Sequence, residues 1–175
     1  GVDRALLGTI PLRQGRLRLQ NGISAPNRAL RLPLAAQYWN GSAYITNTLD
    51  SCTRITAANL SFGNYRKTLT TLPNNDAVLT PATVTVANGQ GFISLAAPSG
   101  GRLGSMDIAI ALDSATPPTD QSCLSGWVPT KAATQGANLA ALRSPWCSGS
   151  KDPSARATWG LYRGSDGVIY QRENF

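Results

Sequence analysis

The chain has no histidine, and this absence limits the chemistry that its polar side chains can perform. Serine and cysteine nucleophiles usually need a neighbouring histidine base, so the Ser-His-Asp and Cys-His classes of active site are excluded. The lysines Lys67, Lys131 and Lys151 are interpreted as solvated surface residues. No nucleophilic site is therefore predicted.

Paired carboxylates remain, because two of them can share the acid and base roles in the cleavage of a glycosidic bond. Most of the acidic residues stand beside turn residues, where aspartate commonly caps the backbone, and we favour that structural interpretation. Loop aspartates also suit calcium, but no D-x-D-x-D-G loop occurs, so a metal site stays open and no cofactor is expected. The protein is predicted not to be an enzyme. The acidic residues are Asp3, Asp50, Asp76, Asp107, Asp113, Asp120, Asp152, Asp166 and Glu173.

Three cysteines, Cys52, Cys123 and Cys147, form no CxxC pair, and without histidine they do not fit the usual zinc spacings. We predict a disulfide between Cys123 and Cys147, because these two flank one loop-rich insertion. Cys52 would then be the remaining thiol, either buried and inert or paired with a segment outside this chain.

The charge is strongly basic, with a net charge of +7, and arginines gather near the N-terminal end. Arg16 and Arg18 share one strand face by alternation, and with Arg13 they are candidates for binding a polyanion such as DNA or lipopolysaccharide. The alternative is a solvated strand face that discourages pairing between sheet edges.

Aromatic side chains beside turns form the second candidate site. Tyr38, Trp39 and Asn40 end a predicted strand at a turn, and Trp127 and Trp146 flank the insertion. These residues could stack on sugar rings, or they could close the ends of a hydrophobic core.

The elements that would hold these residues are short strands. Apolar residues alternate with polar ones around Leu17 and Leu19 and from Met106 to Leu112, a pattern typical of half-buried strands. Further strands are expected at 30–39, 44–47, 83–87, 92–96, 157–162 and 168–172, separated by turns such as Asn40-Gly41, Asn88-Gly89 and Asp166-Gly167. The alanine-rich stretch 130–143 predicts one short helix within the insertion.

These features predict an all-β protein, an antiparallel β-sandwich in one domain over residues 1–175. No apolar run approaches the roughly 18 residues that a membrane-spanning helix needs. The first residues, Gly1-Val2-Asp3-Arg4, lack an initiator methionine, and we expect the chain to be a fragment of a longer protein.

Two stretches are more specific than the overall pattern. One runs from Gly15-Arg16-Leu17-Arg18-Leu19-Gln20-Asn21 through Pro33-Leu34-Ala35-Ala36-Gln37-Tyr38-Trp39-Asn40-Gly41 to Asn47-Thr48-Leu49-Asp50-Ser51-Cys52-Thr53, and the other covers 152–164. Together with the last seven residues, they resemble the C-terminal domain of MshQ-like proteins. That family is linked to the mannose-sensitive haemagglutinin pilus, a type IV pilus of Gram-negative bacteria.

The resemblance implies the end of a large, exported protein at the cell surface or on a pilus, with pilus subunits or other pilus-tip proteins as partners. The expected function is an adhesin or assembly module that binds a surface, a glycan or a pilus subunit through exposed loops. Two alternatives come from other classes: an extracellular polysaccharide-cleaving enzyme that uses two carboxylates, and a basic domain that binds polyanions.

Overall fold

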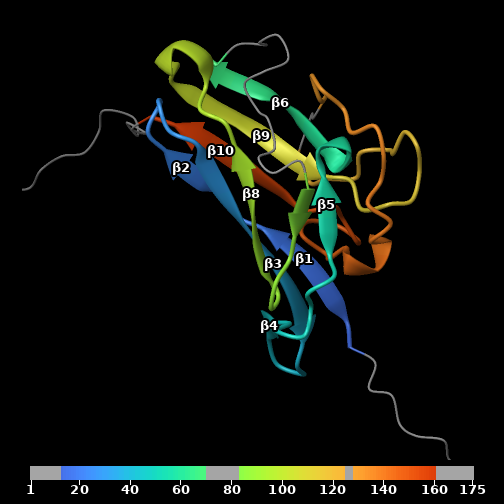
Figure 1. The fold of residues 1–175 in the computed structure, drawn as a ribbon. Coiled ribbons are helices and arrows are strands. Elements are labelled where there is room, and N and C mark those ends of the chain that lie inside the picture. The colour runs from blue at the N-terminus through green and yellow to red at the C-terminus, as the bar shows by residue number, and fades with distance from the viewer. Residues whose placement is uncertain (1–12, 70–82, 125–127, 161–175) are drawn as a thin grey trace, which may run out of the picture.

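Two four-stranded sheets make up most of the computed structural model, which describes residues 13–69, 83–124 and 128–160 (Figure 1). The first sheet is centred on β3, the longest strand, which pairs with β1 along one edge and with β8 and β4 along the other. Its strands are β1 (Gly15–Leu19), β3 (Leu30–Trp39), β4 (Tyr44–Thr46) and β8 (Gln90–Leu95).

The second sheet has the order β2-β10-β9-β6 and is antiparallel except for one pair, because β10 runs parallel to β2. A two-stranded sheet of β5 and β7 lies beside them, and three 3-10 turns complete the described elements. The strands are β2 (Gly22–Ser24), β5 (Arg54–Thr56), β6 (Leu60–Lys67), β7 (Thr83–Thr85), β9 (Gly104–Ile110) and β10 (Ser154–Trp159), and the turns are η1 (Ala57–Asn59), η2 (Ser99–Gly101) and η3 (Ala140–Leu142).

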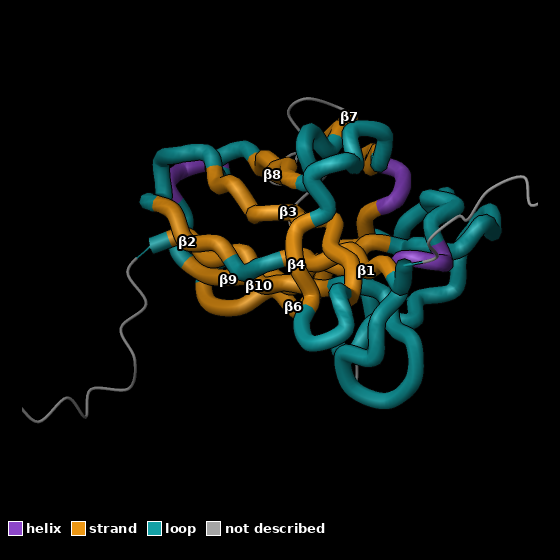
Figure 2. The backbone as a smooth tube through the Cα atoms, turned by 90° about the horizontal axis from the view of Figure 1, so that it is seen from below, coloured by secondary structure: helices purple, strands orange, loops and turns teal. Residues whose placement is uncertain are grey.

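The hydrophobic core lies between the two sheets, whose layered arrangement is visible in Figure 2. Strand alternation builds it, because Leu17 and Leu19 of β1 point inward while Arg16 and Arg18 point outward. In β10, Ala155, Ala157 and Trp159 are buried in the same alternating way. The predicted antiparallel β-sandwich is confirmed.

Strand β9 departs from the expected half-buried pattern. Its five residues from Met106 to Ile110 are all buried, including Asp107, which is 2% exposed. One reason is that β9 lies between β6 and β10, and Asp107 is enclosed by side chains from both of these neighbours.

The stretch 130–143 is mostly not helical, and its helical part is the single turn η3. Backbone N–H groups of Gly136, Ala137, Asn138 and Leu139 donate to carbonyls of residues 111–115 instead of to carbonyls within a helix. Asn138 also has a φ of 56°, which interrupts a right-handed helix. These long-range hydrogen bonds outweigh the helix propensity of the alanines.

Turn residues are found where the sequence predicts them. Asn88 and Gly89, between β7 and β8, have φ angles of 51° and 77°, the left-handed pair that a tight hairpin turn requires. Asn40 and Gly41 join β3 to β4. The predicted hairpin at Asp166-Gly167 lies outside the described residues.

The predicted disulfide between Cys123 and Cys147 is present, and it closes part of the connection between β9 and β10. Cys52 is a free thiol but is exposed, so the expectation that it could be buried is wrong. A disulfide fits a protein that folds in an oxidising compartment, as extracellular and secreted proteins do. Among the helices of the described residues, none is long and apolar enough to cross a membrane.

Removing this disulfide should lower the free energy of unfolding. The bridged cysteines are 24 residues apart, and a loop of this size is worth about 3 kcal/mol in the chain-entropy model. Denaturant unfolding of a Cys123→Ser/Cys147→Ser variant measures the loss, with Cys52→Ser as the control that should change little. Equal stability of the two variants would show that the loop is held by its other contacts alone.

Candidate functional site

Residues of both candidate sets meet on the outer face of the first sheet, near the β3–β4 turn. The guanidinium carbon of Arg16 lies 3.9 Å from the ring centroid of Tyr44 and 4.7 Å from that of Trp146. Trp39 packs edge-on against Tyr44, with 5.2 Å between ring centroids. We name these four residues, Arg16, Trp39, Tyr44 and Trp146, the aromatic cluster.

Strand register explains how three of the four residues come together. Trp39 stands opposite Tyr44 in the β3–β4 pair, and Arg16 stands opposite Gln37 in the β1–β3 pair. Directly opposed residues of antiparallel strands project from the same face, so these side chains share the outer face. The Arg16 Nε donates a 2.7 Å hydrogen bond to Gln37 Oε1, which holds the guanidinium against the two rings.

The fourth residue, Trp146, comes from the insertion. It precedes the bridged Cys147, and it lies between Ser144 and Lys151, which form an isolated bridge between their backbones. The insertion thus carries an aromatic side chain onto the outer face of β1, far from it in sequence.

The environment of Arg16 is partly desolvated. Burial lowers the pKa of its guanidinium from the ordinary value, and the charge of Arg18 acts in the same direction. Arginine keeps its proton at neutral pH, so the cluster carries a cation between two aromatic faces. Such a surface can stack on a planar or ring-shaped ligand and also attract an anionic group.

The predicted arginine row is divided by the fold. Arg18 shares the outer face with Arg16 and lines a hollow of about 130 Å³ together with Trp146 and Ser154. Arg13 lies instead over the ring of Tyr38, 4.2 Å from its centroid. Tyr38 stands opposite Gly15, on the face that does not hold Arg16, so this pair is separate from the aromatic cluster.

Asn40 and Trp127, the other two residues predicted for the aromatic site, are not part of the aromatic cluster as described. The Oδ1 of Asn40 accepts hydrogen bonds from the backbone N–H of Ser42 and Ala43, so this oxygen belongs to the turn between β3 and β4. Trp127 lies outside the described residues. Tyr44 and Gln37 were not predicted as site residues, and only the strand register could have revealed them.

The strands of the second sheet carry one carboxylate, Asp107 of β9, which is 2% exposed. Its Oδ2 accepts hydrogen bonds from Arg66 and Asn64 at 2.9 and 3.0 Å, and its Oδ1 accepts one from Arg156 at 2.8 Å. A register shift in β6 between Gly63 and Arg66 allows both Asn64 and Arg66 to reach this carboxylate. Burial tends to raise the pKa of Asp107, but these hydrogen bonds outweigh it and hold the pKa below its ordinary value.

This network predicts a loss of stability in acid. The pKa of Asp107 is lower in the folded chain than in the unfolded chain, so its ionised carboxylate stabilises the fold. This stabilisation is fully present above the unfolded-state pKa of about 3.9 and is lost as the pH falls through the folded-state pKa. Melting temperatures of the wild type and Asp107→Asn, measured between about pH 6 and pH 2, should converge at the acidic end. A constant difference between the two would contradict the assignment.

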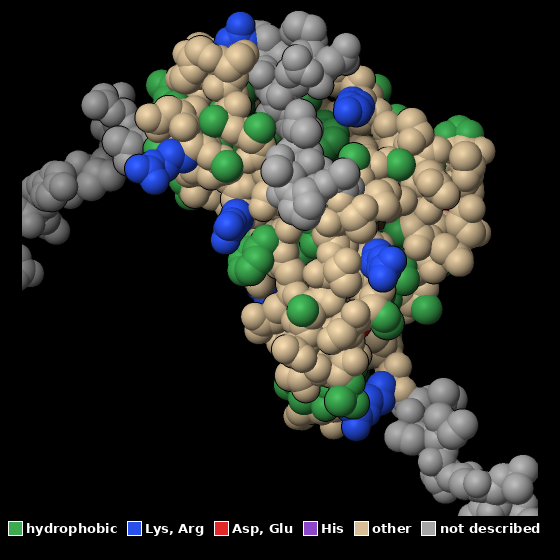
Figure 3. All heavy atoms as spheres, viewed as in Figure 1, with side chains coloured by type: hydrophobic (Ala, Val, Ile, Leu, Met, Phe, Trp, Pro, Cys, Tyr) green, Lys and Arg blue, Asp and Glu red, His purple; other side chains and the backbone are tan. Residues whose placement is uncertain are grey.

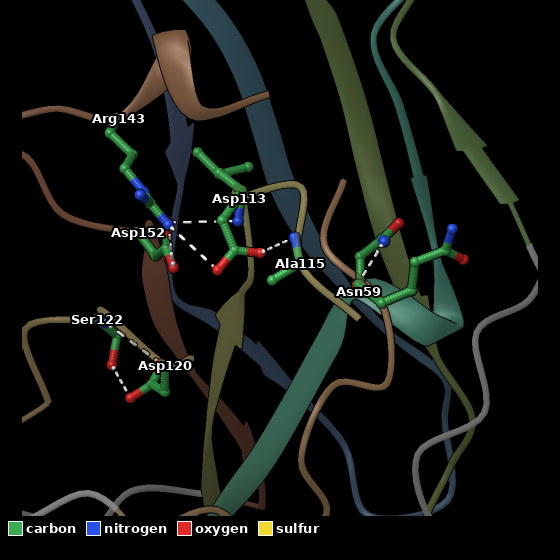
Figure 4. Close-up of polar contacts among 9 residues, drawn as sticks. Asn59, Asp113, Ala115, Asp120, Ser122, Arg143 and Asp152 are labelled. Carbon is green, nitrogen blue, oxygen red and sulfur yellow. Dashed lines mark hydrogen bonds and ion pairs between the residues drawn. The ribbon is translucent and has the colours of Figure 1, made fainter. Parts of the chain in front are cut away.

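A second group of carboxylates, shown in Figure 4, holds the insertion against the sheet. Arg143 Nε donates a 2.7 Å hydrogen bond to Asp152 Oδ1, and an Arg143 nitrogen lies 3.9 Å from Asp113. The backbone N–H of Leu112 also donates to Asp152, which is 1% exposed. Asp152 therefore connects the start of the insertion, its end and Arg143.

The described aspartates thus have structural partners. Asp50 accepts hydrogen bonds from the backbone of Cys52 and Thr53, and Asp120 accepts them from Ser122 (Figure 4). Burial, assisted by the nearby charge of Asp152, raises the pKa of Asp120 against the effect of the Ser122 hydrogen bonds. Ion-pairing and turn-capping of this kind support the structural interpretation. Asp3, Asp76, Asp166 and Glu173 lie outside the described residues.

Within the described part of the chain, no three or more His, Cys, Asp or Glu side chains are grouped so that they could hold a metal ion.

Comparison with known proteins places the chain in a family. Residues 13–174 match the family model described as DUF6701, fourth domain. No curated protein matches the chain, and no solved structure does. Because the match covers nearly the whole sequence, the chain belongs to the DUF6701 family, as its fourth domain.

Proposed function

We propose that this domain is the ligand-binding module of an exported, pilus-associated protein, and that it binds a surface glycan through the aromatic cluster. The observation that carries the proposal is the stack of Arg16 between Tyr44 and Trp146, with Trp39 beside it. Trp39 is 41% exposed and Trp146 is 36% exposed, which leaves aromatic surface accessible to a ligand. Aromatic rings that close a core would be covered instead.

The association with a type IV pilus rests on the sequence resemblance to MshQ-like proteins. The disulfide is in keeping with export, since such bonds persist in oxidising compartments. The two exposed tryptophans of the aromatic cluster come from the end of β3 and from the disulfide-bridged insertion, and they lie on the outer face of the first sheet.

The test compares attachment with pilus formation. In cells that carry the full-length protein, a Trp39→Ala/Trp146→Ala variant should leave the number of pili unchanged and reduce attachment to a surface. Ile23→Ala is the matched control, because Ile23 is an exposed apolar residue of β2 in the other sheet. Deletion of the whole domain provides the second comparison. Loss of pili on deletion would identify an assembly module, and normal attachment of the tryptophan variant would exclude the aromatic cluster as the adhesive surface.

A further inference from the structure

The outer face of the first sheet extends well beyond the aromatic cluster. Outward-facing residues of β3 run from Arg31 to Trp39, eight residues apart, which is roughly 26 Å at the rise of a strand. At the Arg31 end, Phe92 of β8 is 49% exposed, and the guanidinium carbon of Arg31 lies 5.9 Å from the centroid of its ring. An arginine and an exposed aromatic ring therefore recur at the opposite end of the same face.

A groove lies beside this second pair. It has a volume of about 480 Å³ and runs between β8 and β7. This volume falls in the range of roughly 300–1,000 Å³ that is typical of small-ligand sites. Apart from Arg31, the polar side chains that line it are neutral hydroxyls and an amide, from Thr83, Thr85, Gln90 and Ser94. Side chains of this kind both donate to and accept from the hydroxyl groups of a sugar.

The charged side chains on the strands of this face are all positive. The strands β1, β3, β4 and β8 contain no aspartate or glutamate, and they carry Arg16, Arg18 and Arg31. Figure 3 shows Lys and Arg side chains spread among apolar ones over the side of the molecule on which β8 lies, and acidic side chains hardly contribute there. A ligand that covers this face meets cations and aromatic rings, without opposing carboxylates from the strands.

We propose that this face binds an anionic polysaccharide in an extended conformation. One subsite is the aromatic cluster with Arg18, and the second is the groove beside Arg31 and Phe92. The inference rests on the proposed function and adds the charge of the glycan, its extended shape and the second subsite. The three arginines span roughly 20 Å, because Arg16 stands opposite Gln37, six residues from Arg31. This spacing suits a chain with spaced acid groups, whereas duplex DNA presents one charge per ~1.7 Å.

The experiment is calorimetric titration of the 175-residue chain with oligomers of galacturonic acid of increasing length. Affinity should rise with length and level off once an oligomer spans roughly 26 Å, because both subsites are then engaged. Phe92→Ala and Arg31→Ala should weaken the longest oligomers about tenfold and leave the shortest ones unchanged, since loss of one subsite removes the gain from linkage. Ile23→Ala and Arg28→Ala are the matched controls, because both residues are exposed and Arg28 lies in the turn between β2 and β3.

The outcomes separate this inference from the proposed function. If uronate oligomers bind with the same affinity at every length and Phe92→Ala has no effect, the second subsite does not exist, and the proposal that the aromatic cluster binds a glycan is retained. If uncharged glucose oligomers of equal length bind equally well, the anionic character is wrong. Tighter binding of single-stranded oligo(dT) would identify a nucleic-acid surface and overturn the assignment. No binding of any oligosaccharide, together with normal attachment by the Trp39→Ala/Trp146→Ala protein, would remove the proposed function itself.

Discussion

Replacing Trp159 with alanine should lower the free energy of unfolding by about 3–5 kcal/mol. Trp159 is 1% exposed and belongs to the core between the two sheets. Its indole N–H also donates a 3.1 Å hydrogen bond to the carbonyl of Arg28, in the turn before β3. The substitution removes a large buried surface and one of two donors to this carbonyl, which also accepts a 3.4 Å hydrogen bond from the Ser24 hydroxyl.

Denaturant unfolding gives the measurement, and two further variants make it specific. Trp159→Phe keeps most of the buried ring but loses the hydrogen bond and leaves a small cavity, so it should lose about 2 kcal/mol. Trp39→Ala removes the same side chain from an exposed position and should change stability by well under half the loss of Trp159→Ala. Equal effects of the Trp39 and Trp159 substitutions would contradict the core position of Trp159.

The second large effect is expected at Arg143. An Arg143→Met substitution removes the cation that lies 2.7 Å from Asp152 while keeping a side chain of similar length. Asp152, which is 1% exposed, is then left as a buried carboxylate without its charged partner, which typically costs about 3–5 kcal/mol. Chemical denaturation at neutral pH measures the loss.

A double variant separates the charge from the packing. Adding Asp152→Asn to Arg143→Met removes the unpaired charge and should restore at least half of the lost stability. Arg54→Met is the matched control at an exposed position of β5, and it should have an effect within about 0.5 kcal/mol. A double variant that is less stable than Arg143→Met would show that the carboxylate is not the source of the loss.

The sequence reveals those strands in which the two faces differ in polarity. β1, β3 and β10 alternate clearly between apolar and polar residues. The predicted positions of β1 and β3 agree with the structure, whereas β10 runs from Ser154 to Trp159 and overlaps the predicted strand 157–162 only in its second half. β2 and β5 have three residues each and are not among the predicted strands. β6 was also missed, because its register shift breaks the alternation after Gly63.

The candidate site was predictable by residue type but not by arrangement. Arg16, Trp39 and Trp146 were recognised because arginine and tryptophan near turns can bind ligands. Their proximity depends on the β3–β4 register and on the path of the insertion, which are set by long-range contacts. Tyr44 and Phe92 have no distinguishing sequence neighbours, and only the sheet places them on the outer face.

The path of the strands also determines how the domain carries tension. β1 begins at one end of the molecule and β10 ends at the opposite end (Figure 1), and β10 runs parallel to its neighbour β2. A pull on residues 13 and 160 is therefore directed along the strands, so the hydrogen bonds that hold β1 to β3 and β10 to β9 and β2 are loaded in shear. Bonds loaded in shear must break together, whereas strands that are peeled apart lose them one by one. The fold is accordingly oriented to resist a force applied through its two ends.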